Sequence, residues 1–263
     1  MSAIILSCLF FGGFAGILAG LFGLGGGLVL VPFLYWLFSQ QGFDPELIML
    51  MAVATSLATI IITSSAAVLT HHRLRAVLWP LVCYLAPGVF VGAITGAVIA
   101  DYLNAETLKS LFAFFMLYVG LKMAFPFRSE AKKWRSTPVF LMFSGSLIGF
   151  VSTLIGIGGG TLTVPMLTKC GYPMRNAAAV SSACGLPIAM AGTFSYAYLG
   201  WSKSGLPDDC LGYVYLPAFA AIIAASMVMA PAGARLANKL PAQLLKRYFA
   251  IVLLLVAARM LWG

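Results

Sequence analysis

Residues 23–32 read GLGGGLVLVP, and residues 156–165 read GIGGGTLTVP. These two copies of the pattern G-x-G-G-G-x4-P lie 133 positions apart, and the 23 residues around each copy share ten identities. Each copy interrupts an apolar segment, 3–39 or 138–168, that is longer than the roughly 20 residues one helical crossing of a bilayer needs. The pattern therefore predicts a duplicated chain in which each copy opens with a broken membrane helix.

The composition is that of a membrane protein. The chain has 263 residues, of which 62% are hydrophobic and 9% charged, and its mean hydropathy is +1.00. Because soluble domains average about 45–50% apolar and about 25% charged residues, this composition excludes a soluble globular protein, a disordered chain and a disulfide-stapled secreted domain. The net charge of +9 indicates loops near anionic lipid rather than nucleic-acid binding. The five cysteines form no CxxC pair, so we expect packing residues rather than a zinc site or a disulfide framework.

Eight apolar segments account for most of the chain. They cover residues 3–39, 47–70, 77–100, 107–126, 138–168, 177–199, 211–234 and 244–262. A second internal match, with an offset of 137, aligns 103–123 with 240–260. In the first segment, Gly12, Gly16 and Gly20 form a stripe typical of a helix-packing face. The duplication and its basic centre predict three regions: a first transmembrane repeat (1–126), a basic cytoplasmic linker (127–137) and a second transmembrane repeat (138–263).

Loop charges predict how the two repeats are oriented. If each broken segment crossed the membrane once, the loops on either side would carry seven Lys or Arg residues each. If each segment turned back at its glycines, twelve would lie on one side and two, Lys109 and Lys203, on the other. Cytoplasmic loops are enriched in Lys and Arg, and the limbs after Gly27 and Gly160 are too short to cross. We therefore expect an all-α polytopic membrane fold of two inverted repeats, each opening with a glycine-broken re-entrant hairpin, with the N-terminus outside.

Paired glycine turns in the middle of a membrane are suited to binding an anion. A helix that begins there points free N–H groups and its positive dipole at the cavity, and glycine lets a ligand approach the backbone. Inverted repeats with broken helices commonly hold their substrate at such a place. The candidate substrate-binding residues are Gly25, Gly26, Gly27, Gly158, Gly159, Gly160, Thr161, Thr163, Thr55, Ser56, Ser181 and Ser182. The alternatives are that the glycines serve packing or a hinge, and that the hydroxyls bond only carbonyls of their own helix.

Few ionisable residues fall in the apolar segments. His71 and His72 are the candidates for proton coupling, although their position beside Arg73 also suits an interfacial role. Asp101 and Glu106 flank an outer loop, where we expect both to be solvated. Because no acidic residue lies at the centre of an expected helix, the sequence argues against a cation site. Neither a metal nor another cofactor is expected.

These motifs together resemble the sulfite exporter TauE/SafE family of membrane proteins. The resemblance rests on both glycine motifs with their prolines, on Ala54-Thr55-Ser56, on the basic stretch 71–75 before Trp79, and on 171–177 before Ser181-Ser182. It covers essentially the whole chain. It implies a transporter that exports small sulfur-containing anions, such as sulfite or organosulfonates like sulfoacetate, across the bacterial inner membrane.

Four functions are compatible with these residues. The leading hypothesis is a secondary transporter that holds its substrate at the glycine breaks and works by alternating access. An anion channel could use the same lining, and a non-transporting membrane subunit would explain the few ionisable residues. An intramembrane hydrolase would have to pair Ser181 or Ser182 with His71 or His72. The expected partners are a small anion and the lipid bilayer, not nucleic acid, while proton coupling and assembly into a homodimer are open.

Overall fold

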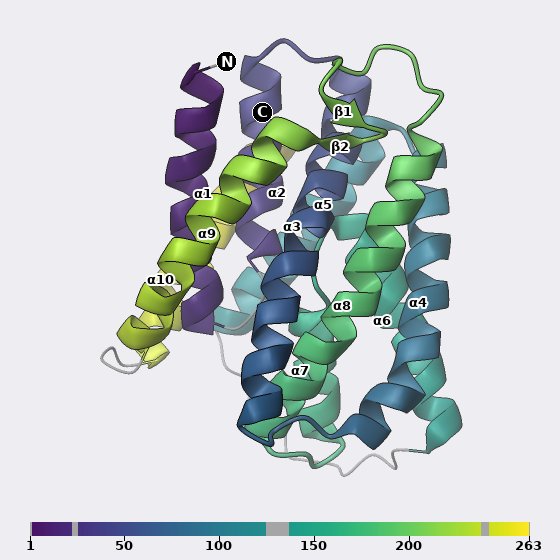
Figure 1. Ribbon diagram of the computed structural model, residues 1–263, viewed down its shortest axis with the longest axis vertical. Coiled ribbons are helices and arrows are strands. Elements are labelled where there is room, and N and C mark those ends of the chain that lie inside the picture. The colour runs from purple at the N-terminus through teal and green to yellow at the C-terminus, as the bar shows by residue number, and fades with distance from the viewer. Residues whose placement is uncertain (1, 23–25, 125–136, 238–241, 263) are drawn as a thin grey trace.

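A computed structural model describes residues 2–22, 26–124, 137–237 and 242–262, and the side chains of 7–17, 26–124, 137–229 and 249–262. In these ranges the chain forms ten helices and one small β-hairpin (Figure 1). The helices are α1 (Ser2–Phe22), α2 (Gly27–Gln40), α3 (Pro45–Arg73), α4 (Trp79–Tyr102), α5 (Ala105–Ala124), α6 (Pro138–Ile155), α7 (Gly160–Lys169), α8 (Met174–Leu199), α9 (Leu216–Ala237) and α10 (Ala242–Trp262). The strands are β1 (Cys210–Leu211) and β2 (Val214–Tyr215), which pair antiparallel.

Five of the helices are long and apolar enough to cross a bilayer, judged on the described residues: α3, α4, α5, α6 and α8. The α3 helix is the centre of the bundle, because every residue from Ile48 to Ile60 is buried. A helix that is apolar all round belongs in an interior. By contrast, large side chains such as Phe143 and Phe194 are 73% and 67% exposed on the outer helices. Such a surface suits hydrocarbon rather than water, so the chain is a multi-pass membrane protein.

Both glycine motifs coincide with a change of helix. The first apolar segment forms α1 and α2, and the fifth forms α6 and α7. In Figure 1, α1 descends from the upper end and α2 returns to it, whereas α6 rises from the lower end and α7 returns downward. The 14 residues of α2 and the 10 of α7 span about 21 and 15 Å, well short of about 30 Å of hydrocarbon.

Glycines allow two pairs of helices to pack backbone to backbone. A Cβ placed on Gly12 or Gly16 of α1 would lie 2.8 or 2.7 Å from the Cα of Ile222 or Ser226 in α9. Contacts this short leave no room for a side chain, so Gly12 and Gly16 do form the expected packing face. The side-chain position of Gly20 lies outside the described residues.

The same kind of contact joins α6 to α4. A Cβ on Gly145 would lie 2.8 Å from the carbonyl oxygen of Leu85, and one on Gly149 would overlap the carbonyl of Val89. In both helix pairs the residue number rises in the same direction along the two partners, so α1 runs parallel to α9 and α6 runs parallel to α4.

Hydrogen bonds between loops define the two ends of the molecule. At the lower end in Figure 1, just before α4 begins, the carbonyl of Leu74 accepts from Nη2 of Arg175 at 2.7 Å. At the upper end, in the last turn of α4, Asp101 accepts from the hydroxyl of Tyr213 at 2.6 Å and lies 3.6 Å from Nζ of Lys203. The expectation that Asp101 is solvated is therefore wrong, because its side chain is 13% exposed and held by both partners.

The hairpin at the upper end was not expected from the sequence. The seventh apolar segment was predicted to begin at residue 211, but α9 begins at Leu216 because 210–215 form the paired strands around Gly212, whose φ is +56°. All five cysteines are free thiols. Cys8 and Cys184 are buried as packing residues, whereas Cys83 is exposed.

Candidate functional site

The first turns of α2 and α7 have the same backbone geometry. The residue that precedes each helix, Gly26 or Gly159, is left-handed, with φ of +72° or +74°. L side chains rarely adopt this conformation, which explains the glycine at both positions. Neither helix has a hydrogen bond from a capping side chain. Their first N–H groups are thus available, as in helix N-termini that bind anions.

The two glycine breaks contact each other inside the protein. A Cβ on Gly27 would lie 2.6 Å from the carbonyl oxygen of Gly156 and 3.2 Å from the Cα of Ile157. One on Gly185 of α8 would lie 2.8 Å from the carbonyl oxygen of Gly158. Gly26, Gly27 and residues 156–160 are all buried. Of the predicted glycines, Gly25 lies outside the described residues.

Buried hydroxyls without a protein partner surround the α7 break. The hydroxyl oxygens of Ser152, Thr161 and Thr163 have no hydrogen-bond partner in the protein, and Ser152 and Thr163 are 2% and 1% exposed. The Ser152 oxygen lies 3.6 Å from the Cβ position of Gly159. A buried unpaired hydroxyl costs about 1–3 kcal/mol, so these three groups favour a site that a polar ligand completes.

Sequence reasoning named Thr161 and Thr163 but missed Ser152. Its signal was a hydroxyl seven residues before Gly159, in the last turn of the helix that precedes the break. The alignment of the two repeats did not single out Ser152, because the matching position in the first repeat is Ala19.

The α2 break has its own polar neighbours. A cavity of about 10 Å³ adjoins Gly26 and is lined by Thr59, Thr63 and Ser226, a volume near the minimum for one water molecule. The hydroxyls of Thr59 and Thr63 donate to α3 carbonyls at 2.7 and 3.3 Å. These threonines were also missed, because only the fold brings the middle of α3 beside Gly26.

Three of the other four predicted hydroxyls, those of Thr55, Ser56 and Ser182, have hydrogen-bond partners in the protein. Thr55 accepts from the backbone N–H of Tyr215 at 3.0 Å, and Ser56 donates to the Gly156 carbonyl at 2.9 Å. Ser182 donates to the carbonyl four residues earlier in its own helix. Ser181 is buried, at 3% exposure. Ser56 thus fixes α3 to the second break, and substrate contact by these four residues stays a prediction.

The histidines lie at the lower end, away from the breaks. Ile60 of α3 contacts Gly27 and Gly158, whereas His71 is eleven residues further on, about 16 Å along the helix. Nδ1 of His72 accepts from the indole N–H of Trp79 at 3.3 Å. No cluster of three or more His, Cys, Asp or Glu residues suited to a metal occurs among the described residues.

Comparison with known proteins gives the family. Residues 8–260 match the family described as sulfite exporter TauE/SafE. The chain belongs to this family. A probable membrane transporter protein of Haemophilus influenzae is 38% identical over 261 residues, which cover 99% of each chain.

More distant relatives carry the same description. A probable membrane transporter protein of Methanocaldococcus jannaschii is 27% identical over 82% of this chain and 78% of its own. A probable membrane transporter protein of Bacillus subtilis is 29% identical over 76% of this chain and 80% of its own. No solved structure matches the chain. The protein is therefore a multi-pass membrane transporter of the TauE/SafE family.

Proposed function

We propose that this transporter is a secondary transporter that exports small sulfur-containing anions, sulfite or organosulfonates such as sulfoacetate, across the bacterial inner membrane by alternating access. The substrate binds near the midplane, between the N-terminal ends of α2 and α7. One observation carries the proposal: beside the left-handed Gly159, the buried hydroxyls of Ser152 and Thr163 have no protein partner.

The two halves of the chain are inverted repeats in this proposal. The offset of 133 relates Gly12 to Gly145, and the offset of 137 relates Leu85 to Ile222. Gly12 contacts Ile222 where α1 packs on α9, and Gly145 contacts Leu85 where α6 packs on α4. The two helix contacts therefore correspond to each other under these offsets. Two glycine-broken re-entrant hairpins, α1–α2 and α6–α7, then enter the membrane from opposite sides.

The lower end of the molecule is cytoplasmic and the N-terminus is outside. Arg73, Arg75 and Arg175 lie at the lower end, where Arg175 bonds the Leu74 carbonyl. Lys203 lies at the upper end with Asp101. The excess of cations at the lower end supports this orientation, since Lys and Arg are enriched in cytoplasmic loops.

Sulfur oxyanions fit the chemistry of these donors. A sulfite or sulfonate group presents several oxygen acceptors, and backbone N–H groups at a helix start favour negative charge. Hydroxyl donors add hydrogen bonds without a fixed cation, which allows the anion to leave again, as transport requires. The second repeat supplies more hydroxyls than the first, where Leu28 and Leu30 replace Thr161 and Thr163.

The test is uptake of radiolabelled sulfite into proteoliposomes, with and without a pH gradient. Thr163→Val removes a buried hydroxyl at constant shape, and we expect uptake at low sulfite concentration to fall about tenfold or more, because a hydrogen bond to a charged group is lost. Thr168→Val is the matched control on α7, since its hydroxyl bonds the Pro165 carbonyl of its own helix. It should transport like the wild type.

Each outcome has a distinct meaning. Equal losses in both variants would contradict a substrate role for Thr163. Absence of uptake by folded wild-type protein would exclude sulfite, and the assay would be repeated with sulfoacetate. Uptake without saturable counterflow would indicate a channel instead of a transporter. A response to the pH gradient would support proton coupling.

A further inference from the structure

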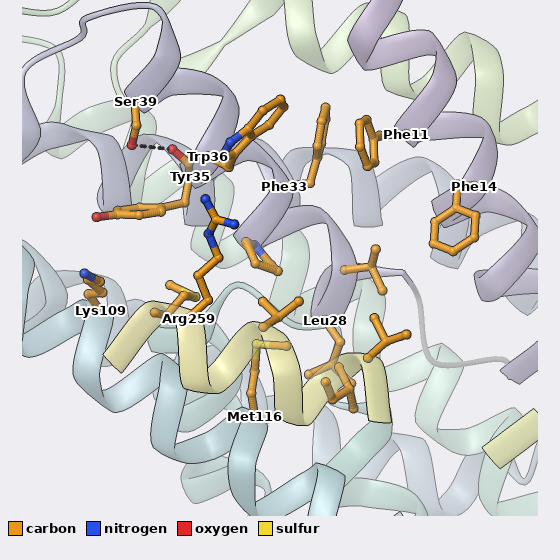
Figure 2. Close-up of a pocket in the computed structure, with 16 residues that line it drawn as sticks. Phe11, Phe14, Leu28, Phe33, Tyr35, Trp36, Ser39, Lys109, Met116 and Arg259 are labelled. Carbon is orange, nitrogen blue, oxygen red and sulfur yellow. Dashed lines mark hydrogen bonds between the residues drawn. The ribbon is translucent and has the colours of Figure 1, made fainter. Parts of the chain in front are cut away.

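A second, larger cavity extends along α2 from its first turn towards its C-terminal end. It has a volume of about 510 Å³ and is bounded by α1, α2, α5 and α10 (Figure 2). This volume falls in the range of about 300–1,000 Å³ that organic ligands occupy in proteins. Most of the lining is apolar or aromatic, and includes Phe11, Phe14, Phe33 and Val256. Nothing in the proposed transport mechanism uses this space.

The polar groups of the cavity are gathered at one end. Figure 2 shows Lys109 and Arg259 close to Tyr35 and Ser39, whereas Phe11 and Phe14 lie at the opposite side. Nζ of Lys109 lies 5.7 Å from the centre of the Tyr35 ring, a distance at which the ring attracts and orients the ammonium group. Among the side chains that the structure describes, no salt bridge joins Lys109 or Arg259 to a carboxylate. The cavity therefore offers two unpaired cations at the mouth of an apolar groove.

The length and exposure of the groove match one leaflet of a bilayer. On α2 the lining runs from Leu28, next to the glycine break, to Ser39, eleven residues or about 16 Å along the helix. That is about half of the roughly 30 Å hydrocarbon thickness. Phe14, Trp36 and Val252 line the groove and are 44%, 44% and 42% exposed, so the groove opens on the surface that faces lipid.

From this geometry we propose that the groove binds an anionic phospholipid of the leaflet in which α2 ends. Lys109 and Arg259 bind the phosphate, Ser39 and Tyr35 lie beside the headgroup, and an acyl chain lies along the aromatic wall towards Leu28. Charge complementarity selects an anionic over a zwitterionic lipid, since each basic residue near an anionic lipid surface favours binding. A small sulfur anion would leave most of the apolar wall unfilled.

Native mass spectrometry of the full-length protein in detergent tests this site, with phosphatidylglycerol and phosphatidylcholine as probes. In the double variant Lys109→Gln, Arg259→Gln we expect roughly a tenfold weaker affinity for phosphatidylglycerol and unchanged binding of phosphatidylcholine. Lys122→Gln is the matched control. Lys122 lies on α5, as Lys109 does, and its Nζ lies 5.5 Å from the centre of the Tyr118 ring, but it does not line the groove.

A second pair of variants tests the apolar part of the groove with both cations in place. Val252→Trp fills the groove and should abolish tight binding of phosphatidylglycerol. Ile251→Trp is the control, because Ile251 is 53% exposed on the same helix and does not line the groove.

Two results would overturn the lipid site. One is an equal loss of phosphatidylglycerol in the Lys122→Gln control, which would indicate attraction by the general surface charge. The other is unchanged lipid binding in both groove variants together with lost sulfite uptake, which would make the groove a path for the transported anion. Failure of sulfite uptake in the wild type would leave the lipid result intact.

Discussion

At the scale of single residues, Gly16 tests how closely α1 and α9 are packed. A Cβ there would lie 2.7 Å from the Cα of Ser226, a backbone atom that cannot move away. We expect Gly16→Ala to lower the free energy of unfolding by about 1–3 kcal/mol, partly offset by up to about 1 kcal/mol of gained helix propensity. Gly13→Ala is the control, since its Cβ would lie 3.4 Å from the flexible Met229 side chain. Denaturant unfolding in micelles measures both, and equal stabilities would contradict the close packing.

Single hydroxyls also show what the sequence could and could not predict. The repeat singled out Thr55 and Ser56 as candidates for substrate contact, which stays a prediction. Their bonds to Tyr215 and Gly156 could not be foreseen, because both partners are about 100 or more residues away along the chain. Ser152 was missed for the opposite reason: its importance comes from having no partner, which only a folded interior reveals.

At the scale of elements, the hairpin of β1 and β2 is held to the bundle by Tyr213. Burial and the hydrogen bond to Asp101 raise the pKa of this hydroxyl above its usual value of 10. The tyrosine therefore remains a donor, and the stability it contributes is present below about pH 10 and lost only as the pH rises through the higher folded-state pKa.

Removing this donor should loosen the hairpin. We expect Tyr213→Phe to lower the free energy of unfolding by about 1.5–3 kcal/mol, the range for a hydrogen bond to a charged group, and to speed limited proteolysis within 200–215. Tyr198→Phe, at a tyrosine that is 83% exposed, is the control and should change neither. A proteolysis rate unaffected by Tyr213→Phe would contradict a role for the hydrogen bond to Asp101 in holding the hairpin.

The sequence predicted that one helix ends and another begins at each glycine motif, but it did not predict the β-hairpin of β1 and β2. Four closely spaced glycines followed by a proline are a strong local signal, because few other residues tolerate the turn that α2 and α7 require. The strands of the hairpin are only two residues long and apolar, so residues 211–215 looked like the start of the next helix. The lipid groove had no sequence signal, since it arises only where four helices from both halves meet.

At the scale of the whole molecule, the inverted arrangement that we propose predicts that residues 41 and 174 lie on opposite sides of the membrane. In a variant without native cysteines, we expect Gln41→Cys to react with an impermeant maleimide in intact cells and Met174→Cys to react only after lysis. Both positions are exposed, so access decides the result. If each glycine-broken segment crossed the membrane once, both cysteines would be labelled from outside.

The contact of Gly12 with Ile222 also sets an order of assembly during synthesis. These residues are about 200 positions apart, so at roughly 5–20 residues per second α1 is made some 10–40 seconds before α9. Gly88 and Met142, which join α4 to α6, are made within a much shorter interval. The α1 helix thus leaves the ribosome well before its partner, and the bare backbone of its glycine face has to be shielded until α9 arrives.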